Sequence, residues 1–282
     1  MNFYEPATLE EAAGLLAKDE DARPLAGGAT LVAMMNAELL EPTSLVSLRR
    51  IASLNGISTS SDGTVTIGAM TTHHEVSNTE VLDGGQAIVR HAARVIGHPA
   101  IRNMGTMGGS ISHADPAADY PAALVAANAM IETFGPSGTR DIKAEDFFID
   151  FLETSLEQGE LVSAVRLPPS SRGSSAAYEK FARVDGDFAT LSVAVVVTMD
   201  TDTCTQIRVS LGSAGPTPVR ADMADAALVG TVLDDDAVSA AAAILIEASD
   251  PLDDVRGSAE YRMMLVPELL RRAIAGARKL RS

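Results

Sequence analysis

The sequence of 282 residues predicts an α+β fold. In its first part, short strand patterns alternate with helical patterns, whereas its last part has three strand-like runs followed by three helical patterns. A serine-rich stretch between these parts, residues 170–175, has the composition of a linker. We therefore predict two domains, residues 1–175 and residues 176–282.

Local signals define the elements of the first domain. The spacing of Thr8 and Glu11 is typical of a capping box and predicts a helix to about Lys18. Turn sequences at Asp62-Gly63 and at residues 135–138 lie between alternating runs and predict two hairpins. The remaining predictions are strands at residues 22–26, 44–48 and 161–167, and helices at residues 31–39, 121–129 and within 81–96.

The second domain is simpler. Its predicted strands are residues 177–183, 191–199 and 206–211, and its predicted helices are residues 220–228, 235–248 and 258–280. This order predicts a small sheet covered by C-terminal helices.

The composition excludes several classes of protein. A net charge of -16 argues against binding nucleic acid or an anionic membrane surface, both of which require basic patches. Cys204 is the only cysteine, so the chain can form no internal disulfide and can hold no iron–sulfur cluster. The histidines lack metal-site spacing, and no metal is expected. With no apolar run of ~18 residues and no signal peptide, we expect a cytoplasmic protein without membrane insertion.

Two glycine-rich turns are the most informative motifs. Their glycines are Gly27, Gly28, Gly108 and Gly109. Each turn can form a nest of backbone N–H donors, because glycine has no side chain to keep a phosphate away. Thr30 and Thr106 can add hydroxyl donors. Hydrogen bonds to charged oxygens contribute roughly 1.5–3 kcal/mol each, so several would hold a diphosphate tightly.

Each of these features also has an ordinary explanation. A glycine pair between a strand and a helix is usually only a turn. Asp119, at the end of the second motif, can accept hydrogen bonds from ribose hydroxyls, but an acid there can equally complement a helix dipole. Their combination and order favour a ligand site. Neither G-x-G-x-x-G nor a P-loop is present, so other nucleotide-binding motifs are not indicated.

Motifs along the whole chain resemble one family. They are Ala26-Gly-Gly, Ile101-Arg-Asn-x-Gly-Thr-x-Gly-Gly, Ala114-Asp-Pro-Ala-Ala-Asp119, Tyr178-Glu-Lys-Phe, Gly186-Asp-Phe-Ala189 and Asp254-Val-Arg-Gly-Ser-Ala-Glu-Tyr-Arg262. In this order they resemble the FAD-binding medium subunit of the molybdenum hydroxylases. That family includes carbon monoxide dehydrogenase, xanthine dehydrogenase and bacterial N-heterocycle dehydrogenases, such as those for nicotine and caffeine.

The resemblance implies a fold and a cofactor. The first domain would be a PCMH-type, vanillyl-alcohol-oxidase-like FAD-binding domain with subdomains at about residues 1–55 and 56–175. The second would be an α+β domain like the C-terminal domain of carbon monoxide dehydrogenase flavoproteins. FAD would be bound without a covalent link.

The resemblance also implies two groups of residues around the pyrophosphate of FAD. One group is Ala26, Gly27, Gly28, Ala29, Thr30 and Leu31, and the other is Thr106, Gly108, Gly109 and Ser110. Two of these positions depart from the family pattern. Ser110 replaces the usual Asn, and Ala29 stands where relatives often have Gln or Thr. Both changes leave backbone contacts possible, so we still expect FAD to bind.

Five further residues are implied at the cofactor. Asp119 would lie on the ribose and adenine side, and Val162 would contact FAD through its backbone. Ile96 and Gly97 would lie close to the isoalloxazine ring. Lys180 would approach the ring, where a cation favours the anionic reduced form. The alternative for Lys180 is an exposed strand lysine.

The remaining candidates are expected to have structural roles. His73 and His74 are predicted in a solvent-facing turn, the alternative being a contact with the flavin or a partner subunit. It stays open whether His113 lies near the cofactor. No catalytic acid or base is expected, because electron transfer through a flavin needs none. Arg256 and Arg262 are expected to form structural or interface ion pairs.

The resemblance implies an electron-transfer subunit. A large subunit would carry the molybdopterin cofactor and a small subunit two [2Fe-2S] clusters, in an (αβγ)2 assembly. Electrons would pass from the clusters to FAD and then to an external acceptor. The single cysteine agrees with this division, because this chain itself can hold only the flavin.

Two other functions were weighed against this one. A stand-alone oxidase of the vanillyl-alcohol-oxidase type would often hold its flavin covalently, and its C-terminal domain would differ. A non-catalytic assembly protein would have lost the flavin, which the intact glycine turns argue against.

Overall fold

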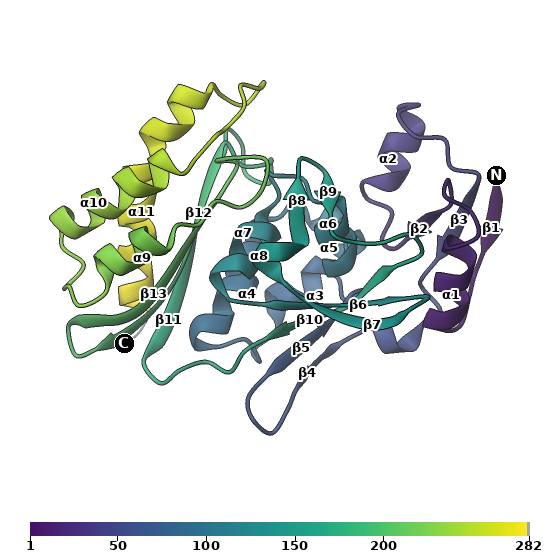
Figure 1. Ribbon diagram of the computed structural model, residues 1–282, viewed down its shortest axis with the longest axis horizontal. Coiled ribbons are helices and arrows are strands. Elements are labelled where there is room, and N and C mark those ends of the chain that lie inside the picture. The colour runs from purple at the N-terminus through teal and green to yellow at the C-terminus, as the bar shows by residue number, and fades with distance from the viewer. Residues whose placement is uncertain (281–282) are drawn as a thin grey trace.

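The computed structural model describes residues 1–280, which fold into the mixture of strands and helices that the sequence predicts. Three larger sheets follow one another along the long axis of the molecule, from the N-terminal end to the C-terminal helices (Figure 1). A short hairpin of β8 (Phe148–Asp150) and β9 (Glu153–Thr154) completes the strands of this part of the chain. No helix within the described residues is long and apolar enough to cross a bilayer.

The N-terminal sheet has three parallel strands in the order β1-β3-β2. The strands are β1 (Asn2–Tyr4), β2 (Arg23–Leu25) and β3 (Ser44–Ser47). Helix α1 (Leu9–Leu16) begins where the capping residues predict, because the Thr8 hydroxyl accepts a hydrogen bond from the Glu11 N–H at 3.2 Å. Helix α2 (Leu31–Asn36) follows β2 and has no buried residue.

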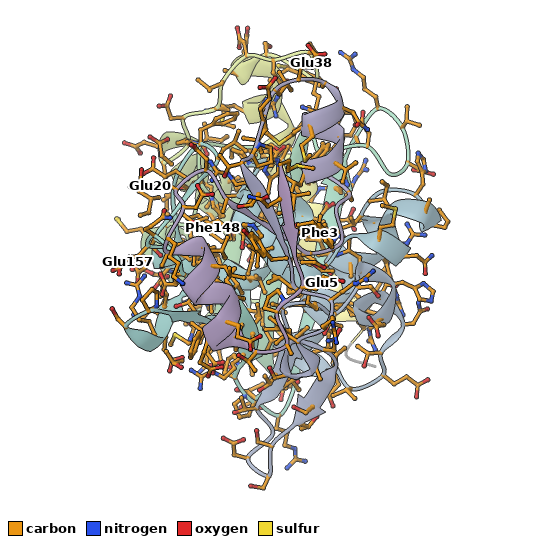
Figure 2. The ribbon with its side chains drawn as sticks, turned by 90° about the vertical axis from the view of Figure 1, so that its right-hand side faces the viewer. Phe3, Glu5, Glu20, Glu38, Phe148 and Glu157 are labelled. Carbon is orange, nitrogen blue, oxygen red and sulfur yellow. The ribbon has the colours of Figure 1, made fainter. Side chains whose placement is uncertain are left out.

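Acidic side chains surround this end of the molecule. Figure 2 shows Glu20, Glu38 and Glu157 around the N-terminal sheet, and all three are exposed. Since the whole chain carries a net charge of -16, an anion that binds here must be held by local donors against the overall field.

The central sheet has five antiparallel strands in the order β4-β5-β10-β6-β7. The strands are β4 (Ile57–Thr59), β5 (Val65–Gly68), β6 (Met130–Gly135), β7 (Gly138–Lys143) and β10 (Leu161–Leu167). Both predicted hairpins, β4–β5 and β6–β7, are confirmed. Buried residues such as Ile67, Ile131 and Val165 form a core with the helices that cover the sheet.

The helices of this part lie between the strands in sequence. They are η1 (Ala52–Leu54), α3 (His73–Asn78), η2 (Gly84–Gln86), α4 (Ala87–Val95), α5 (Pro99–Met104), α6 (Met107–His113), α7 (Asp119–Ala126) and α8 (Ala144–Phe147). Helix α7 is buried along its whole length and lies between the central sheet and the third sheet.

The third sheet is antiparallel and has helices on both faces. Its strands, in order, are β11 (Ser174–Phe181), β12 (Leu191–Asp200) and β13 (Thr203–Gly212), and the C-terminal helices are α9 (Asp222–Leu228), α10 (Asp235–Glu247) and α11 (Ala259–Lys279). One face packs its valines against α9, α10 and α11 in a second core. The other face packs on α4 and α7 of the first part.

Small residues line the face that meets α7. Ser192 pairs with Gly212 across β12 and β13, and Ala194 pairs with Ser210. A β-carbon added at Gly212 would lie 2.4 Å from the Ser192 hydroxyl oxygen and 3.5 Å from the β-carbon of Ala122 in α7. The helix can approach the sheet this closely only because these side chains are small.

The strands and helices that the sequence predicts are confirmed to within a few residues, but β1, α8 and the hairpin of β8 and β9 were not predicted. The region interpreted as a single glycine-rich turn contains two short helices, α5 and α6. The serine-rich stretch is also more ordered than a free linker, because the hydroxyls of Ser170 and Ser174 accept hydrogen bonds from the N–H groups of Gln86 and Gly85. The domain boundary near residue 175 stays a prediction.

We expect Gly212→Ala to destabilise the protein, because the added methyl group overlaps the Ser192 hydroxyl at the interface of the two parts. The expected loss in the free energy of unfolding, measured with urea, is about 1–3 kcal/mol. Adding Ser192→Ala removes the overlapping oxygen and should restore most of that loss. A double variant as unstable as Gly212→Ala would show that another contact is responsible.

Candidate cofactor site

Backbone amides without protein partners lie between β2 and α2. Within residues 1–280, no protein atom accepts a hydrogen bond from the N–H groups of residues 27–31. Gly28 has a φ of +79°, a left-handed conformation that glycine adopts without strain. Free N–H groups in a turn that leads into a helix are the donors that phosphates bind.

This first turn lies directly against the end of α5. A β-carbon added at Gly27 would lie 1.7 Å from the Met104 carbonyl oxygen, so the two backbones are in contact there. A β-carbon added at Gly109 would lie 3.5 Å from that of Ala26. The two glycine motifs, far apart in the sequence, are therefore neighbours in the structure.

The second motif differs from the predicted nest of amides. Residues 107–113 form α6, and its N-cap Thr106 accepts a hydrogen bond from the Gly109 N–H at 3.2 Å. The Gly108 N–H donates to the Ala69 carbonyl at 2.8 Å, and the Ser110 N–H donates to the Thr106 carbonyl. Because protein acceptors already occupy these N–H groups, the predicted nest at Gly108 and Gly109 is wrong.

Gly108 is needed instead for packing. A β-carbon added there would lie 2.6 Å from the β-carbon of Ala69, which follows β5. Gly109 is exposed and Ser110 is half-buried, so the Ser110 hydroxyl can still reach a ligand on this side. The buried Thr106 hydroxyl accepts the Gly109 N–H and keeps its own hydrogen to donate.

His73 is buried, and its prediction as a solvent-facing residue is wrong. Its ring lies 5.2 Å from that of Tyr120, with Nδ1 3.3 Å from the tyrosine hydroxyl. A β-carbon added at Gly105 would lie 2.5 Å from His73 Nε2, so the ring packs against the turn between α5 and α6. Burial, with a smaller effect of the Arg102 charge, lowers the pKa of His73 to about 4. His74 is exposed, as predicted, and His113 is half-buried at the end of α6.

Asp119 and Lys180 form a buried ion pair. The Lys180 ammonium lies 2.9 Å from Asp119 Oδ2 and 3.1 Å from the Val95 carbonyl oxygen. The Tyr178 hydroxyl donates to Asp119 Oδ1 at 2.8 Å. Burial raises the pKa of Asp119 above its usual value, although Lys180 and Tyr178 both favour its ionised form. The structure thus brings together two residues that the sequence assigned to different parts of the cofactor.

Ile96 and Gly97 follow α4 and are half-buried. The Arg102 guanidinium donates to their carbonyl oxygens at 3.1 and 2.7 Å, which fixes the turn before α5. A β-carbon added at Gly186 would lie 2.9 Å from the Gly97 carbonyl, so the segment between β11 and β12 packs on this turn. Val162 is buried in β10 and pairs with Thr133 of β6, next to a bulge in the ladder.

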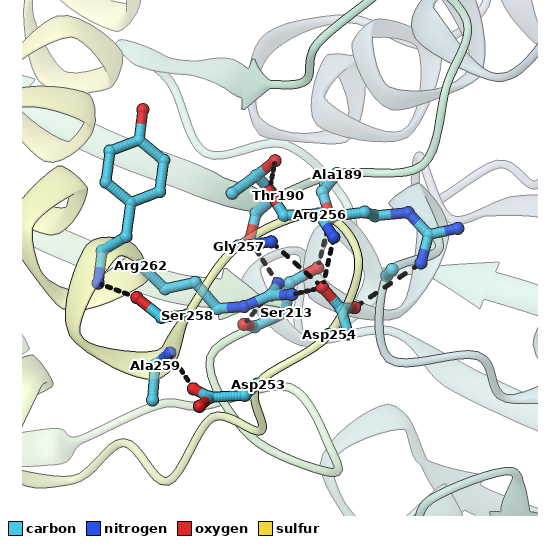
Figure 3. A network of polar contacts seen from close by, with 12 residues as sticks. Ala189, Thr190, Ser213, Asp253, Asp254, Arg256, Gly257, Ser258, Ala259 and Arg262 are labelled. Atoms are coloured by element: carbon cyan, nitrogen blue, oxygen red, sulfur yellow. Dashed lines mark hydrogen bonds and ion pairs between the residues drawn. The ribbon is translucent and has the colours of Figure 1, made fainter.

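Two motifs that the sequence singled out, residues 186–189 and residues 254–262, meet in one network of polar contacts (Figure 3). The Arg262 guanidinium donates to the Thr190 carbonyl and to Asp254 Oδ1, each at 2.5 Å. The Arg256 guanidinium lies 5.1 Å from the ring of Phe188. Ser213 links the network to the loop before α7, because its N–H donates to the Pro116 carbonyl at 2.9 Å.

This network confirms that the two arginines form structural ion pairs. Arg256 and Arg262 both pair with Asp254. Their contacts hold residues 188–190 in place, and the same segment continues to Gly186 on the turn of Gly97. Residues 254–262 therefore stabilise the segment that packs on the turn at Gly97.

Sequence reasoning missed two contributors to the site. Tyr178 lies two positions before Lys180, and side chains alternate along a strand, so a shared face could have been predicted. Arg102 was not identified, because its bonds to the two carbonyls depend on the path of the turn rather than on a local pattern. Within the described residues, no group of three or more His, Cys, Asp or Glu side chains could hold a metal ion.

Comparison with known proteins identifies the family. The model of the FAD-binding domain in molybdopterin dehydrogenase matches residues 1–170, and that of the carbon monoxide dehydrogenase flavoprotein C-terminal domain matches residues 176–277. The chain belongs to the FAD-binding medium subunits of the molybdenum hydroxylases. This confirms the predicted fold and the assignment as a subunit of an oxidoreductase.

Relatives of this medium subunit align over nearly their whole length. The carbon monoxide dehydrogenase medium chain of Afipia carboxidovorans is 40% identical over 98% of this chain and 96% of its own. The nicotine 6-hydroxylase medium subunit of Paenarthrobacter nicotinovorans is 35% identical over 99% and 98%. A structure of reconstituted carbon monoxide dehydrogenase from Oligotropha carboxidovorans superposes with a TM-score of 0.95, at 39% identity over 99% of this chain and 98% of that one.

Substitution of Gly27 should abolish FAD binding by this medium subunit. In Gly27→Ala the new methyl group overlaps the Met104 carbonyl, and no side-chain rotation can relieve a backbone overlap. The two motifs must then separate, at a cost of at least ~1–3 kcal/mol. We expect loss of most flavin absorbance from the purified protein.

Gly14→Ala is the matched control for that variant. No atom lies within 4 Å of a β-carbon added at Gly14, which is in α1. This variant should keep its FAD and gain about 0.5–1 kcal/mol of stability. Equal flavin content in the Gly27 and Gly14 variants would contradict the importance of the close contact.

The stability of the protein should depend on the protonation of His73. Its pKa in the folded state is about 4, below the ordinary value of 6.5, so the unfolded chain binds a proton more readily. The neutral His73 side chain therefore makes its full contribution to the free energy of unfolding above pH 6.5. That contribution falls by up to about 3 kcal/mol as the pH drops towards 4. In His73→Asn this titration is absent, so the stability difference between wild type and variant should shrink over that range. A difference independent of pH would contradict the buried neutral state.

Proposed function

We propose that this chain carries FAD, bound non-covalently, as the electron-transfer subunit of a molybdenum-dependent hydroxylase. The observation that carries the proposal is the row of unpartnered N–H groups at residues 27–31, where the backbone also makes its closest contact with the second glycine motif. These donors fit a diphosphate in a strongly acidic protein, because they supply positive potential without a charged side chain. FAD, when bound, supplies one- and two-electron redox chemistry.

The phosphate side of the proposed site is asymmetric. Residues 26–31 hold the pyrophosphate with main-chain N–H groups. On the other side, the hydroxyls of Thr106 and Ser110 replace the amide nest that the glycines do not provide. Gly109 is exposed and has no side chain, so it leaves this side open to a close approach, whereas Gly108 packs on Ala69. We assign to Val162 a backbone contact with the cofactor.

The ring side lies at the other end of α5. A helix of six residues spans about 9 Å, which separates the phosphate contacts at Met104 from the turn at Ile96 and Gly97. Lys180 reaches the same turn through its bond to the Val95 carbonyl. An ammonium at this place favours the negative charge that reduction adds to the ring.

Partner subunits complete the proposed function. Relatives of this chain are named medium chains of dehydrogenases or the medium subunit of a hydroxylase, and Cys204 is the only cysteine here. We therefore assign the molybdopterin cofactor to a large partner and two [2Fe-2S] clusters to a small one, in an (αβγ)2 assembly. Electrons reach this subunit from the clusters and leave it for an external acceptor. A cytoplasmic location stays a prediction from the sequence.

The function is testable in the complex without knowing the substrate. The complex, purified with its partner chains, should release one FAD per medium subunit on acid precipitation. Illumination with a sacrificial amine reduces flavins directly, so the electron paramagnetic resonance signal of reduced [2Fe-2S] clusters should then appear. The complex with Gly27→Ala should contain clusters but show no light-dependent signal.

Two results would contradict this function. Flavin that stays with the precipitated protein would favour a covalent oxidase. Clusters that remain oxidised while the flavin is fully reduced would show that this subunit does not exchange electrons with them.

A further inference from the structure

We infer that Asp119 acts on the flavin through Lys180, as a positioning and charge-compensating residue, rather than by binding the ribose of FAD. This inference rests on the proposed function, since it concerns the ring side of the same site. It differs from the role that the family resemblance implies for Asp119.

The contacts of Asp119 leave little of it for a ligand. Its side chain is 5% exposed and that of Lys180 is 7% exposed. Each carboxylate oxygen already accepts a hydrogen bond at normal length, Oδ1 from Tyr178 at 2.8 Å and Oδ2 from Lys180 at 2.9 Å. A ribose diol would have to compete with a charged and a phenolic donor in a site that excludes water.

Lys180 has the opposite arrangement. An ammonium has three N–H groups, and two of them point to Asp119 and to the Val95 carbonyl. These two acceptors fix the direction of the side chain, and residues 1–280 provide no acceptor for its third N–H group. Val95 directly precedes Ile96 and Gly97, so the free N–H group lies at the turn proposed to face the ring.

Burial explains why the lysine needs the aspartate. An unpaired ammonium this deeply buried would cost several kcal/mol of desolvation free energy. Asp119 offsets that cost, and the N-terminus of α7 and the Tyr178 hydroxyl in turn stabilise its carboxylate. The ion pair of Lys180 and Asp119 has no net charge. The negative charge of Asp119 therefore weakens the positive potential that Lys180 exerts on the proposed position of the ring.

The two roles for Asp119 predict different behaviour on substitution. If Asp119 compensates the charge of Lys180, Asp119→Asn removes a negative charge near the ring and makes reduction easier. Lys180→Ala removes the positive charge and makes reduction harder. If Asp119 binds ribose, its substitution weakens FAD binding and leaves the midpoint potential of the bound flavin unchanged.

The experiment is a dye-equilibrated redox titration of the FAD-loaded complex at pH 6, together with the Kd for FAD. We expect Asp119→Asn to raise the midpoint potential of the flavin and Lys180→Ala to lower it. At a fixed solution potential, each shift should change the ratio of reduced to oxidised flavin at least tenfold. That factor corresponds to about 30 mV for a two-electron couple. The Kd for FAD should change less than tenfold in Asp119→Asn.

Glu268→Gln is the control. It removes one carboxylate charge from an exposed group in α11, where Glu268 pairs with Arg271 and Arg272, so the midpoint potential should shift by less than about 30 mV. The double variant Asp119→Asn with Lys180→Gln leaves no single charge buried, and therefore remains testable if a single variant fails to assemble. Its midpoint potential should lie between those of the two single variants.

The outcomes separate this inference from the proposed function. A Kd for FAD raised more than tenfold in Asp119→Asn, with an unchanged midpoint potential, would overturn the inference in favour of a ribose contact. Shifts of the same sign in Asp119→Asn and Lys180→Ala would also overturn it. A wild-type complex without FAD would overturn the proposed function itself.

Discussion

The contact between Gly27 and the Met104 carbonyl is the constraint on which the candidate site depends. It can exist only without a side chain at residue 27, and it fixes the first glycine turn against the end of α5. The other end of α5 begins after the turn at Gly97. The Arg102 guanidinium donates a hydrogen bond to the Gly97 carbonyl, and the backbone at Gly186 packs against the same turn. One backbone contact and one short helix therefore set the distance between the phosphate side and the ring side.

Electrostatics explain why the site is built mostly from main-chain donors. A protein with a net charge of -16 repels a dinucleotide at long range, and clustered basic side chains at the site would form ion pairs with the acidic surroundings. Amides carry fixed partial charges that such surroundings cannot neutralise by pairing. The Lys180 ammonium, at the proposed ring side, is held in place by the Asp119 carboxylate, so its field acts over a short range.

The sequence predicts the elements that depend on local signals, but not the contacts between segments that are distant in the chain. Alternation in the three strands beyond residue 175 and the capping pair Thr8 and Glu11 are local signals, and they give the correct elements. The second glycine motif shows the limit. The same glycines suit a loop that binds anions and a helix that packs tightly, and the contact with Ala69 that decides between them comes from another strand.

The same limit applies to single residues. His73 has the sequence surroundings of an exposed turn, but Tyr120 and Gly105 enclose it from distant positions. The family resemblance indicated Asp119 and Lys180 separately, whereas only the packing of α7 against β11 shows that they share one ion pair.

Helix α2 has a consequence for the stability of the empty subunit. None of its residues is fully buried, although Leu31, Met34 and Met35 are half-buried. The amides that precede it have no acceptor within residues 1–280, so the polypeptide holds this helix weakly. Segments of this kind open first in a native protein, and a ligand that binds only the closed form stabilises them in proportion to its saturation. An empty subunit should therefore differ from a loaded one mainly at this end, where a bound ligand would supply the hydrogen-bond acceptors that residues 1–280 do not provide.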